Sequence, residues 1–253
     1  MGEIGRRAGW ARLIAAAAGA VAAFGACGAM AEALRIGVEA AYPPFSFIND
    51  NGEVDGFERD LGDELCRRAG LDCVWVKNDW ESIIPNLVSG NYDAVIAAMT
   101  ITPARERVIA FTHEYYPPDP SVYMAMDGAG HEVRQGVVAA AATSVQAAYI
   151  VDSGATLVEF PSWDDTIAAL NNGEVDAVLA DKGFLEDVAR GTDLAYAFIG
   201  EELQIGGGMG IGLRKSDQEL KARLDAGLNE MKADGTLEDL IGRWFDDHDA
   251  SEE

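Results

Sequence analysis

Short apolar runs alternate with longer amphipathic segments along the chain, and each pattern predicts one kind of element. Residues 34–39, 73–76 and 209–213 have the apolar pattern of buried strands, and 58–69, 217–234 and 237–244 have the pattern of helices. Gly70 predicts the end of the first of these helices. Asn51-Gly52, which lies between two apolar runs, predicts a β-hairpin. Strands that alternate with helices in this way predict an α/β fold with a largely parallel sheet.

One helix-and-strand unit occurs twice, with the copies 83 residues apart. Residues 84–97 and 167–180 each contain a helix end, a glycine, an aspartate three positions later and an apolar strand. A proline-rich segment, 115–120, and three glycines, 206–208, break the pattern between and after the copies. These breaks favour two lobes joined by two crossovers. The alternative is a single doubly wound sheet that uses a common connection twice.

The first 31 residues have the pattern of an export signal. Three arginines precede an apolar run from Leu13 to Met30, and Ala29-Met30-Ala31 matches an A-x-A cleavage site. We therefore expect residues 1–31 to be removed during export. A membrane anchor is the alternative, because the run approaches the ~20 residues that a bilayer span needs. Lipidation at Cys27 is a second and less favoured alternative.

Acidic residues dominate the chain. The formal net charge is −24, and it becomes −26 without residues 1–31. Nucleic acid is a poor partner for such a surface. Solubility, or a salty habitat, accounts for most of this excess, although a cationic ligand would also be attracted.

Two cysteines, Cys66 and Cys73, follow the export signal. In an exported protein such a pair predicts a disulfide, here between the end of a helix and the start of the next strand. The bond closes a short loop and contributes a few kcal/mol at most. Two cysteines and three scattered histidines predict no metal site.

Polar and aromatic residues follow the predicted strands. Ligands of open α/β sheets bind beyond the carboxyl ends of the strands, so these residues are candidates for a site. They are Glu39 and Tyr42 after the first strand, Ala98, Met99 and Thr100 after the first copy of the repeated unit, and Asp181 after the second copy.

Arg105 lies in the first turn of a predicted short helix, because Thr102 can cap a helix that begins at Pro103. A cation there opposes the helix dipole, which favours a role in binding an anion such as a carboxylate. An ordinary salt bridge to Glu106 or Asp93 is the alternative.

Two other candidates also have a structural interpretation. Asp181 directly precedes a predicted helix and can simply cap it. Ser144, or Thr143 beside it, can cap the next predicted helix, although a helix start with free N–H groups also binds carboxylates.

Tyr42 and Trp80 lie in turn-like surroundings, and two such rings can sandwich a flat or cationic side chain. Packing in the core is the usual role of aromatic residues and remains the alternative. Glu39 would supply a counter-charge. Arg105, Asp181 and Glu39 together carry a net charge of −1, which is complementary to a zwitterion with one extra positive charge.

Several motifs, in this order, resemble those of one protein family. They are Gly37-Val38-Glu39-Ala40-Ala41-Tyr42-Pro43-Pro44-Phe45, Gly56-Phe57-Glu58-Arg59-Asp60-Leu61, Ala97-Ala98-Met99-Thr100-Ile101-Thr102-Pro103-Ala104-Arg105, Ala180-Asp181 and Gly210-Ile211-Gly212-Leu213-Arg214. From about Leu34 to Phe245 the chain resembles the periplasmic polar amino-acid binding proteins of ABC importers, which are extracellular solute-binding proteins of family 3. It is most similar to the lysine, arginine, ornithine, histidine and opine binders.

The resemblance implies a two-lobed periplasmic binding protein fold of type II, in which two α/β lobes are joined by two crossover strands. We expect one lobe from residues 32–121 and 208–253 and the other from 122–207. The resemblance also implies a periplasmic monomer that closes around a basic amino acid, such as arginine, lysine, ornithine or histidine, or around an opine, and that docks on an ABC permease. It implies neither a cofactor nor a catalytic residue.

Residue roles follow from the same resemblance. Arg105 would bind the ligand α-carboxylate, with backbone N–H groups at Thr100 and at Ser144 and Val145. Asp181, the Thr100 hydroxyl and the Ala98 carbonyl would hold the α-ammonium, and Met99 belongs to the same segment. Tyr42 and Trp80 would stack on the side chain, and Glu39 would meet its distal cation. The disulfide also matches one found in the basic amino-acid binders.

The chain departs from the family pattern at a few positions. Ala97 and Ala98 replace serines of some basic amino-acid binders, Val145 replaces a common hydroxyl residue, and Thr143 stands where glycine is frequent. Two other functions remain open on the same fold. One is a cyclohexadienyl or arogenate dehydratase, which needs an acid or base at the reacting carbon. The other is a ligand-sensing module, which we favour less because no signalling domain follows in the sequence.

Overall fold

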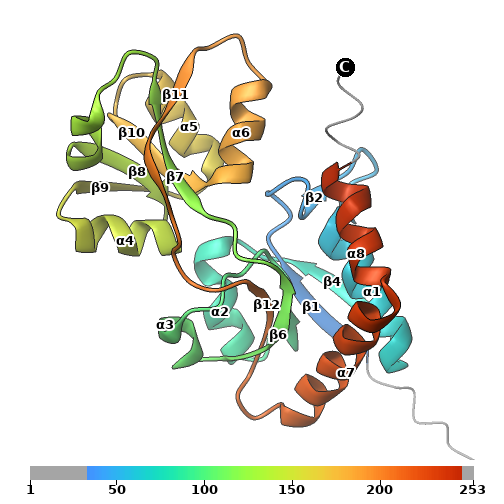
Figure 1. Ribbon diagram of the computed structural model, residues 1–253. Coiled ribbons are helices and arrows are strands. Elements are labelled where there is room, and N and C mark those ends of the chain that lie inside the picture. Colours follow the sequence, from blue (N-terminus) through green and yellow to red (C-terminus); the bar gives the residue numbers. More distant parts are fainter. Residues whose placement is uncertain (1–32, 247–253) are drawn as a thin grey trace, which may run out of the picture. The chain divides into compact units, whose positions relative to one another are not determined.

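The computed structural model of the 253-residue chain describes residues 33–246 (Figure 1). Within this range the strands form two five-stranded sheets and one two-stranded hairpin. The predicted export signal and Cys27 lie outside the described residues, so cleavage and lipidation stay predictions. None of the helices between residues 33 and 246 combines the length and the apolar character that a bilayer span requires.

The first sheet has the strand order β4-β1-β5-β12-β6, in which β1 is parallel to β4 and β5 while β12 is antiparallel to β5 and β6. Its strands are β1 (Leu34–Val38), β4 (Cys73–Lys77), β5 (Ala94–Val95), β6 (Ala110–Tyr116) and β12 (Met209–Leu213). Its helices are α1 (Phe57–Ala69), α2 (Trp80–Val88), α3 (Pro103–Glu106), α7 (Gln218–Asp234) and α8 (Thr236–Ile241), which continues as a π-helical turn at Gly242–Asp246. The predicted hairpin is present as β2 (Phe47–Ile48) and β3 (Val54–Asp55).

The second sheet has the order β11-β7-β10-β8-β9, in which β8 is parallel to β9 and β10 while β7 is antiparallel to β10 and β11. Its strands are β7 (Ser121–Met126), β8 (Val137–Ala141), β9 (Thr156–Phe160), β10 (Ala177–Asp181) and β11 (Tyr196–Leu203). Its helices are α4 (Val145–Ser153), α5 (Trp163–Asn171) and α6 (Lys182–Arg190), with a 3₁₀ helix at His131–Gln135.

The two copies of the repeated unit lie in different sheets. The first copy forms the end of α2 and β5, and the second forms the end of α5 and β10. The chain enters the second sheet through residues 117–120 and returns through 204–208, where the sequence predicted the two breaks (Figure 1). A single doubly wound sheet is therefore excluded, and the predicted fold of two α/β lobes with two crossovers is confirmed. The residue limits given above remain our proposal for the lobes.

Local sequence signals explain the end of α1. Gly70 has the left-handed backbone conformation, with φ 61°, that a helix C-cap favours and that glycine adopts without strain. The predicted disulfide is present between Cys66, in the last turn of α1, and Cys73 at the start of β4. It ties this helix to the edge strand of the first sheet.

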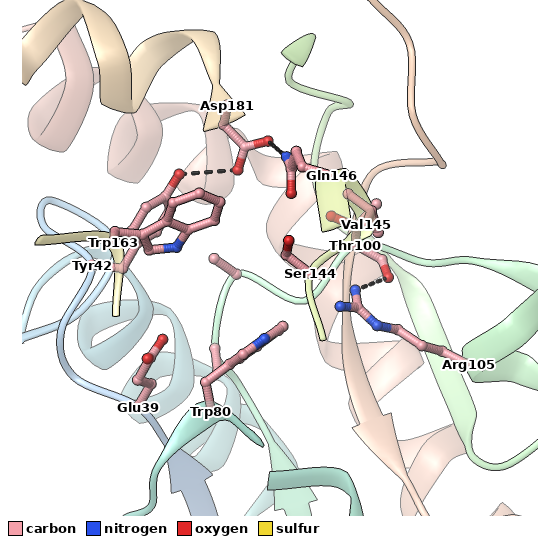
Figure 2. A pocket seen from close by; sticks show the side chains of 12 residues that line it. Glu39, Tyr42, Trp80, Thr100, Arg105, Ser144, Val145, Gln146, Trp163 and Asp181 are labelled. Atoms are coloured by element: carbon pink, nitrogen blue, oxygen red, sulfur yellow. Dashed lines mark hydrogen bonds between the residues drawn. The ribbon is translucent and has the colours of Figure 1, made fainter. Parts of the chain in front are cut away.

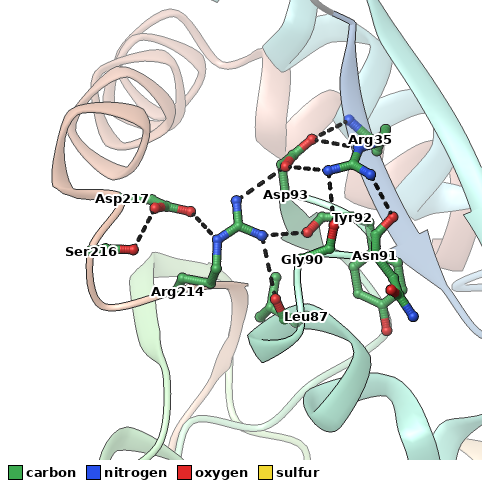
Figure 3. Close-up of polar contacts among 9 residues, drawn as sticks. All are labelled: Arg35, Leu87, Gly90, Asn91, Tyr92, Asp93, Arg214, Ser216 and Asp217. Carbon is green, nitrogen blue, oxygen red and sulfur yellow. Dashed lines mark hydrogen bonds and ion pairs between the residues drawn. The ribbon is translucent and has the colours of Figure 1, made fainter.

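Asp93 holds together the end of the first sheet at which β1 and β5 begin (Figure 3). Its carboxylate is 2.9 Å from Arg35 Nη2 and 3.1 Å from Arg214 Nη2, and Arg214 also forms an ion pair with Asp217. Although burial raises the pKa of Asp93, the hydrogen bonds from Arg35 and Arg214 leave it below its usual value. Asp93 is thus engaged by other arginines, which removes it as a partner for Arg105.

Candidate functional site

A pocket lined by residues of both lobes lies where the sequence placed the site (Figure 2). The space between its lining atoms is about 380 Å³, part of which is open to solvent. The lining residues are Glu39, Tyr42, Trp80, Ala97, Ala98, Thr100, Arg105, Ser144, Val145, Gln146, Trp163 and Asp181. Every predicted site residue except Met99 is among them.

Met99 differs from the prediction because its side chain is fully buried. It packs in the core under α2 with Val95 and Ala97, whereas Ala94 and Ile96 pack on the opposite side. Side chains alternate between the two faces of an extended segment, so Met99 follows Val95 into the core. Its place in this two-residue period was a signal that the sequence already contained.

Arg105 is held at the pocket by backbone oxygen atoms. The predicted cap is confirmed, since Thr102 Oγ1 accepts a hydrogen bond from Arg105 N at 3.2 Å and Pro103 begins α3. Arg105 Nη1 donates to the carbonyl oxygen of Thr100 at 2.8 Å, and Nη2 donates to that of Thr143, in the other lobe, at 3.5 Å. Its guanidinium lies 5.2 Å from the centre of the Trp80 ring.

No carboxylate of the described residues forms an ion pair with Arg105, so the predicted alternative of a salt bridge to Glu106 or Asp93 is not realised. Burial lowers the pKa of Arg105 to about 10, against the attraction of Asp181. The side chain therefore stays charged at neutral pH. A guanidinium has five donors, and an anion in the pocket can use those that the two carbonyl groups leave.

Asp181 precedes α6, but its side chain makes no capping hydrogen bond. Its Oδ2 instead accepts from Tyr42 Oη at 2.9 Å, and its Oδ1 accepts from Gln146 Nε2 at 2.7 Å. The first bond joins the two lobes (Figure 2). Burial raises the pKa of Asp181 to about 6, opposed by Tyr42, Gln146 and then Arg105. The carboxylate is turned toward the pocket and its partners are neutral.

Glu39 follows β1 and lines the same pocket (Figure 2). Burial raises its pKa to about 7, with further contributions from Glu58 and Asp79 and a smaller opposing one from Lys77. Among residues 33–246 it forms no hydrogen bond or ion pair. A carboxylate in this situation gains most from a cation that enters the pocket.

The aromatic residues are arranged differently from a simple sandwich. The Tyr42 ring stacks on Phe45 at 5.6 Å and is tilted against Phe184 at 5.4 Å and Trp163 at 6.1 Å. Trp80 faces the Arg105 guanidinium instead. Tyr42 therefore contributes its hydroxyl group and the edge of an aromatic cluster to the pocket.

Ser144 caps α4, because its Oγ accepts from Ala147 N at 3.1 Å. This confirms the capping interpretation of its side chain. Val145 is the first helical residue and lines the pocket through the same helix start. The N–H groups of this first turn give the pocket a partial positive charge opposite the first lobe.

Three lining residues were not predicted. Ala97 precedes the predicted segment directly. Gln146 is almost fully buried and donates to both Asp181 and Ser121. Trp163 begins α5 and reaches Tyr42 from the second lobe. Nothing in the sequence marks Gln146 or Trp163, because the fold alone brings their helices to the pocket.

Within residues 33–246 no cluster of three or more histidine, cysteine or acidic side chains has the arrangement of a metal site.

Two α/β lobes, two crossovers and a pocket of opposite charges between them define a two-lobed binding protein. The chain belongs to the bacterial extracellular solute-binding proteins of family 3, whose family model matches residues 34–247. The predicted family is thereby confirmed, and it is a family of binding proteins rather than of enzymes.

Several known proteins are similar to this chain. It is 34% identical to the L-arginine-binding protein of Pseudomonas aeruginosa, over 84% of this chain and 87% of that protein. It is 33% identical to the lysine/arginine/ornithine-binding periplasmic protein of Escherichia coli, over 86% and 89%. A periplasmic His/Glu/Gln/Arg/opine family-binding protein from Silicibacter pomeroyi, solved in complex with lysine, is 56% identical with a TM-score of 0.80, over 84% of this chain and 96% of that one.

Proposed function

We propose that the chain is the periplasmic binding component of an ABC importer and that it captures an amino acid with a positively charged side chain. One observation carries the proposal. Arg105 and Asp181 come from different lobes, line one pocket, and have only neutral partners among the described residues. Buried charges are costly unless they are paired. A zwitterion between the lobes would pair both of them.

The ligand α-carboxylate would lie at Arg105 and at the N-terminal turn of α4 behind Ser144. The α-ammonium would lie at Asp181, near the Thr100 hydroxyl and the Ala98 carbonyl. This orientation matches negative groups to positive ones at both ends of the pocket. The curated relatives, whose names specify arginine, or lysine, arginine and ornithine, support the same class of ligand.

Glu39 is the reason for choosing a basic ligand. Arg105 would pair with the α-carboxylate of the ligand and Asp181 with its α-ammonium. Glu39 would then be the charged side chain of the pocket that still lacks a partner among the described residues. Burial favours the protonated form of Glu39. A distal ammonium or guanidinium of the ligand would take the place of that proton, so binding would lower the pKa of Glu39. Affinity for basic amino acids should therefore increase as the pH rises through about 7.

Closure is the mechanism that we propose. In an open form each lobe would present half of the site, and rotation about residues 117–120 and 204–208 would bring the halves together. A ligand that contacts both lobes stabilises the closed form relative to the open one. The closed protein would then dock as a monomer on the membrane permease.

The test is isothermal titration calorimetry on protein that has been unfolded and refolded to remove bound ligand. We expect lysine, arginine or ornithine to bind and glutamate not to bind. Glu39→Gln should weaken binding of the basic ligand by about 2 kcal/mol or more, because a buried charge pair is lost. Glu81→Gln removes the same charge from the exposed start of α2 and serves as the matched control.

Two outcomes would contradict the proposal. Glutamate binding as tightly as lysine would remove the role of Glu39, and the absence of binding by every amino acid would remove the function itself.

The raised pKa values of Glu39 and Asp181 would also suit proton transfer by a dehydratase. We expect the purified protein to leave prephenate and arogenate unchanged, and turnover of either would establish the enzyme instead.

A further inference from the structure

A buried carboxylate, Glu58, lies beside the pocket and has no part in the function proposed above. It is the second residue of α1, and its side chain is 0% exposed. It does not line the pocket. No lysine, arginine or histidine of the described residues forms an ion pair with it. A buried charge without a cation is unusual and calls for an explanation.

Three donors from separate parts of the first lobe converge on this carboxylate. Ser46 Oγ donates to Oε2 at 3.0 Å, and Tyr115 Oη and Ala98 N each donate to Oε1 at 2.5 Å. Burial raises the pKa of Glu58, while the hydrogen bonds from Tyr115, Ala98 and Ser46 oppose that effect. The contact with Ala98 is the one that connects Glu58 to the pocket.

Ala98 has a left-handed backbone, with φ 45°. This conformation is unfavourable for a residue with a Cβ atom and persists only where surrounding contacts enforce it. Ala98 lines the pocket, and its carbonyl oxygen accepts no hydrogen bond from residues 33–246. The bond from Ala98 N to Glu58 fixes the peptide at which the extended segment turns.

Glu58 also acts on the pocket electrostatically. After burial, its charge is the largest influence that raises the pKa of Glu39, ahead of Asp79 and against Lys77. Geometry places both acids on the first-lobe side of the pocket, because Glu39 lines it and Glu58 contacts the peptide of Ala98, which also lines it. A cation that enters there interacts with both of them.

We propose that Glu58 is a positioning residue of the amino-acid site, which holds the Ala98 peptide in place and strengthens the preference for a positively charged side chain. This inference rests on the proposed function. The two effects are separable, since one depends on hydrogen bonding and the other on charge.

Glu58→Gln separates them. A glutamine can keep its oxygen at the position that accepts from Ala98 and Tyr115, and its amide can donate to Ser46 Oγ, so the shape is conserved while the charge is lost. We expect lysine affinity at pH 8 to fall on the order of tenfold. We also expect the rise of lysine affinity with pH to move to lower pH, because the pKa of Glu39 falls.

Two further variants complete the test. Tyr115→Phe removes one hydrogen bond from the same carboxylate but keeps the Ala98 contact and the charge, so lysine affinity should stay within about threefold. Glu58→Ala removes both effects, and the folded fraction, measured by circular dichroism, should bind lysine more weakly than Glu58→Gln does. Calorimetry between pH 5.5 and 8.5 is the measurement.

A melting temperature that falls in Glu58→Gln while lysine affinity and its pH profile stay unchanged would overturn the inference, because Glu58 would then be purely structural. Equal losses in Tyr115→Phe and Glu58→Gln would also overturn it. If the wild-type protein bound no amino acid at any pH, the proposed function itself would fail, and this result is distinct from both others.

Discussion

Arg105→Ala is the most direct perturbation of the site. Within residues 33–246 the side chain donates only to the carbonyl oxygens of Thr100 and Thr143, so most of its donors are available to a ligand carboxylate. Truncating one partner of a buried, hydrogen-bonded charge pair costs 2–5 kcal/mol or more. We expect a loss of about 4 kcal/mol, which corresponds to roughly a thousandfold in the dissociation constant.

The fold should tolerate this change. Arg105 forms no ion pair with a described residue, and the cap by Thr102 uses its backbone N–H, which alanine retains. The loss of its contact with Trp80 should lower the free energy of unfolding by about 1 kcal/mol. Unfolding in urea, followed by fluorescence, measures this effect separately from binding.

Calorimetry with the tightest ligand of the wild-type protein measures the binding effect. Arg107→Ala, which removes an exposed arginine at the end of the same helix, is the matched control and should bind as the wild type does. Arg105→Lys keeps the charge but not the planar fork, and an intermediate affinity is expected. Retained affinity in Arg105→Ala would refute the assignment, because it would show that the guanidinium serves the structure alone.

Three other predictions concern the same pocket and its support. Tyr42→Phe removes the hydrogen bond that keeps the pKa of Asp181 from rising further, so ligand titrations at pH 6 and 8 should show the larger loss of affinity at pH 6. Because the pKa values of Glu39 and Asp181 are raised, the folded chain binds more protons than the unfolded chain between about pH 4 and 7. Ligand-free protein should therefore melt at a lower temperature at pH 7.5 than at pH 5.5. The opposite order of melting temperatures would contradict this prediction. Replacing Cys66 and Cys73 by serine opens a loop with a sequence separation of 7 and should cost about 2–3 kcal/mol in urea unfolding without altering ligand selectivity.

Local patterns in the sequence were sufficient to predict features that are stabilised by neighbouring residues in the chain. The end of α1 at Gly70, the cap at Thr102 and the apolar run of β12 depend on residues adjacent in the chain, and each was predicted from them. The disulfide followed from the presence of two cysteines after a predicted export signal. The repeated unit predicted two lobes, since it marked where each lobe forms its helix and strand.

Interpretations that depended on distant partners could not be decided in this way. Asp93 was a plausible partner of Arg105 until the sheet brought Arg35 and Arg214 to it. Asp181 had the sequence position of a cap, yet its carboxylate accepts hydrogen bonds from Tyr42 and Gln146. Contacts of this kind exist only once a lobe has folded, and the bond from Tyr42 to Asp181 also requires the two lobes to meet.

The sequence by itself determined several of the helices and strands, the two crossovers and the charged candidates for the site, because each depends on spacing along the chain. Only the tertiary structure decided that Gln146 and Trp163 join the pocket and that Glu58 lies beside it. The reason is geometric: which side chains share a cavity depends on the packing of helices and the turn at Ala98, and neither is encoded in the spacing of nearby residues.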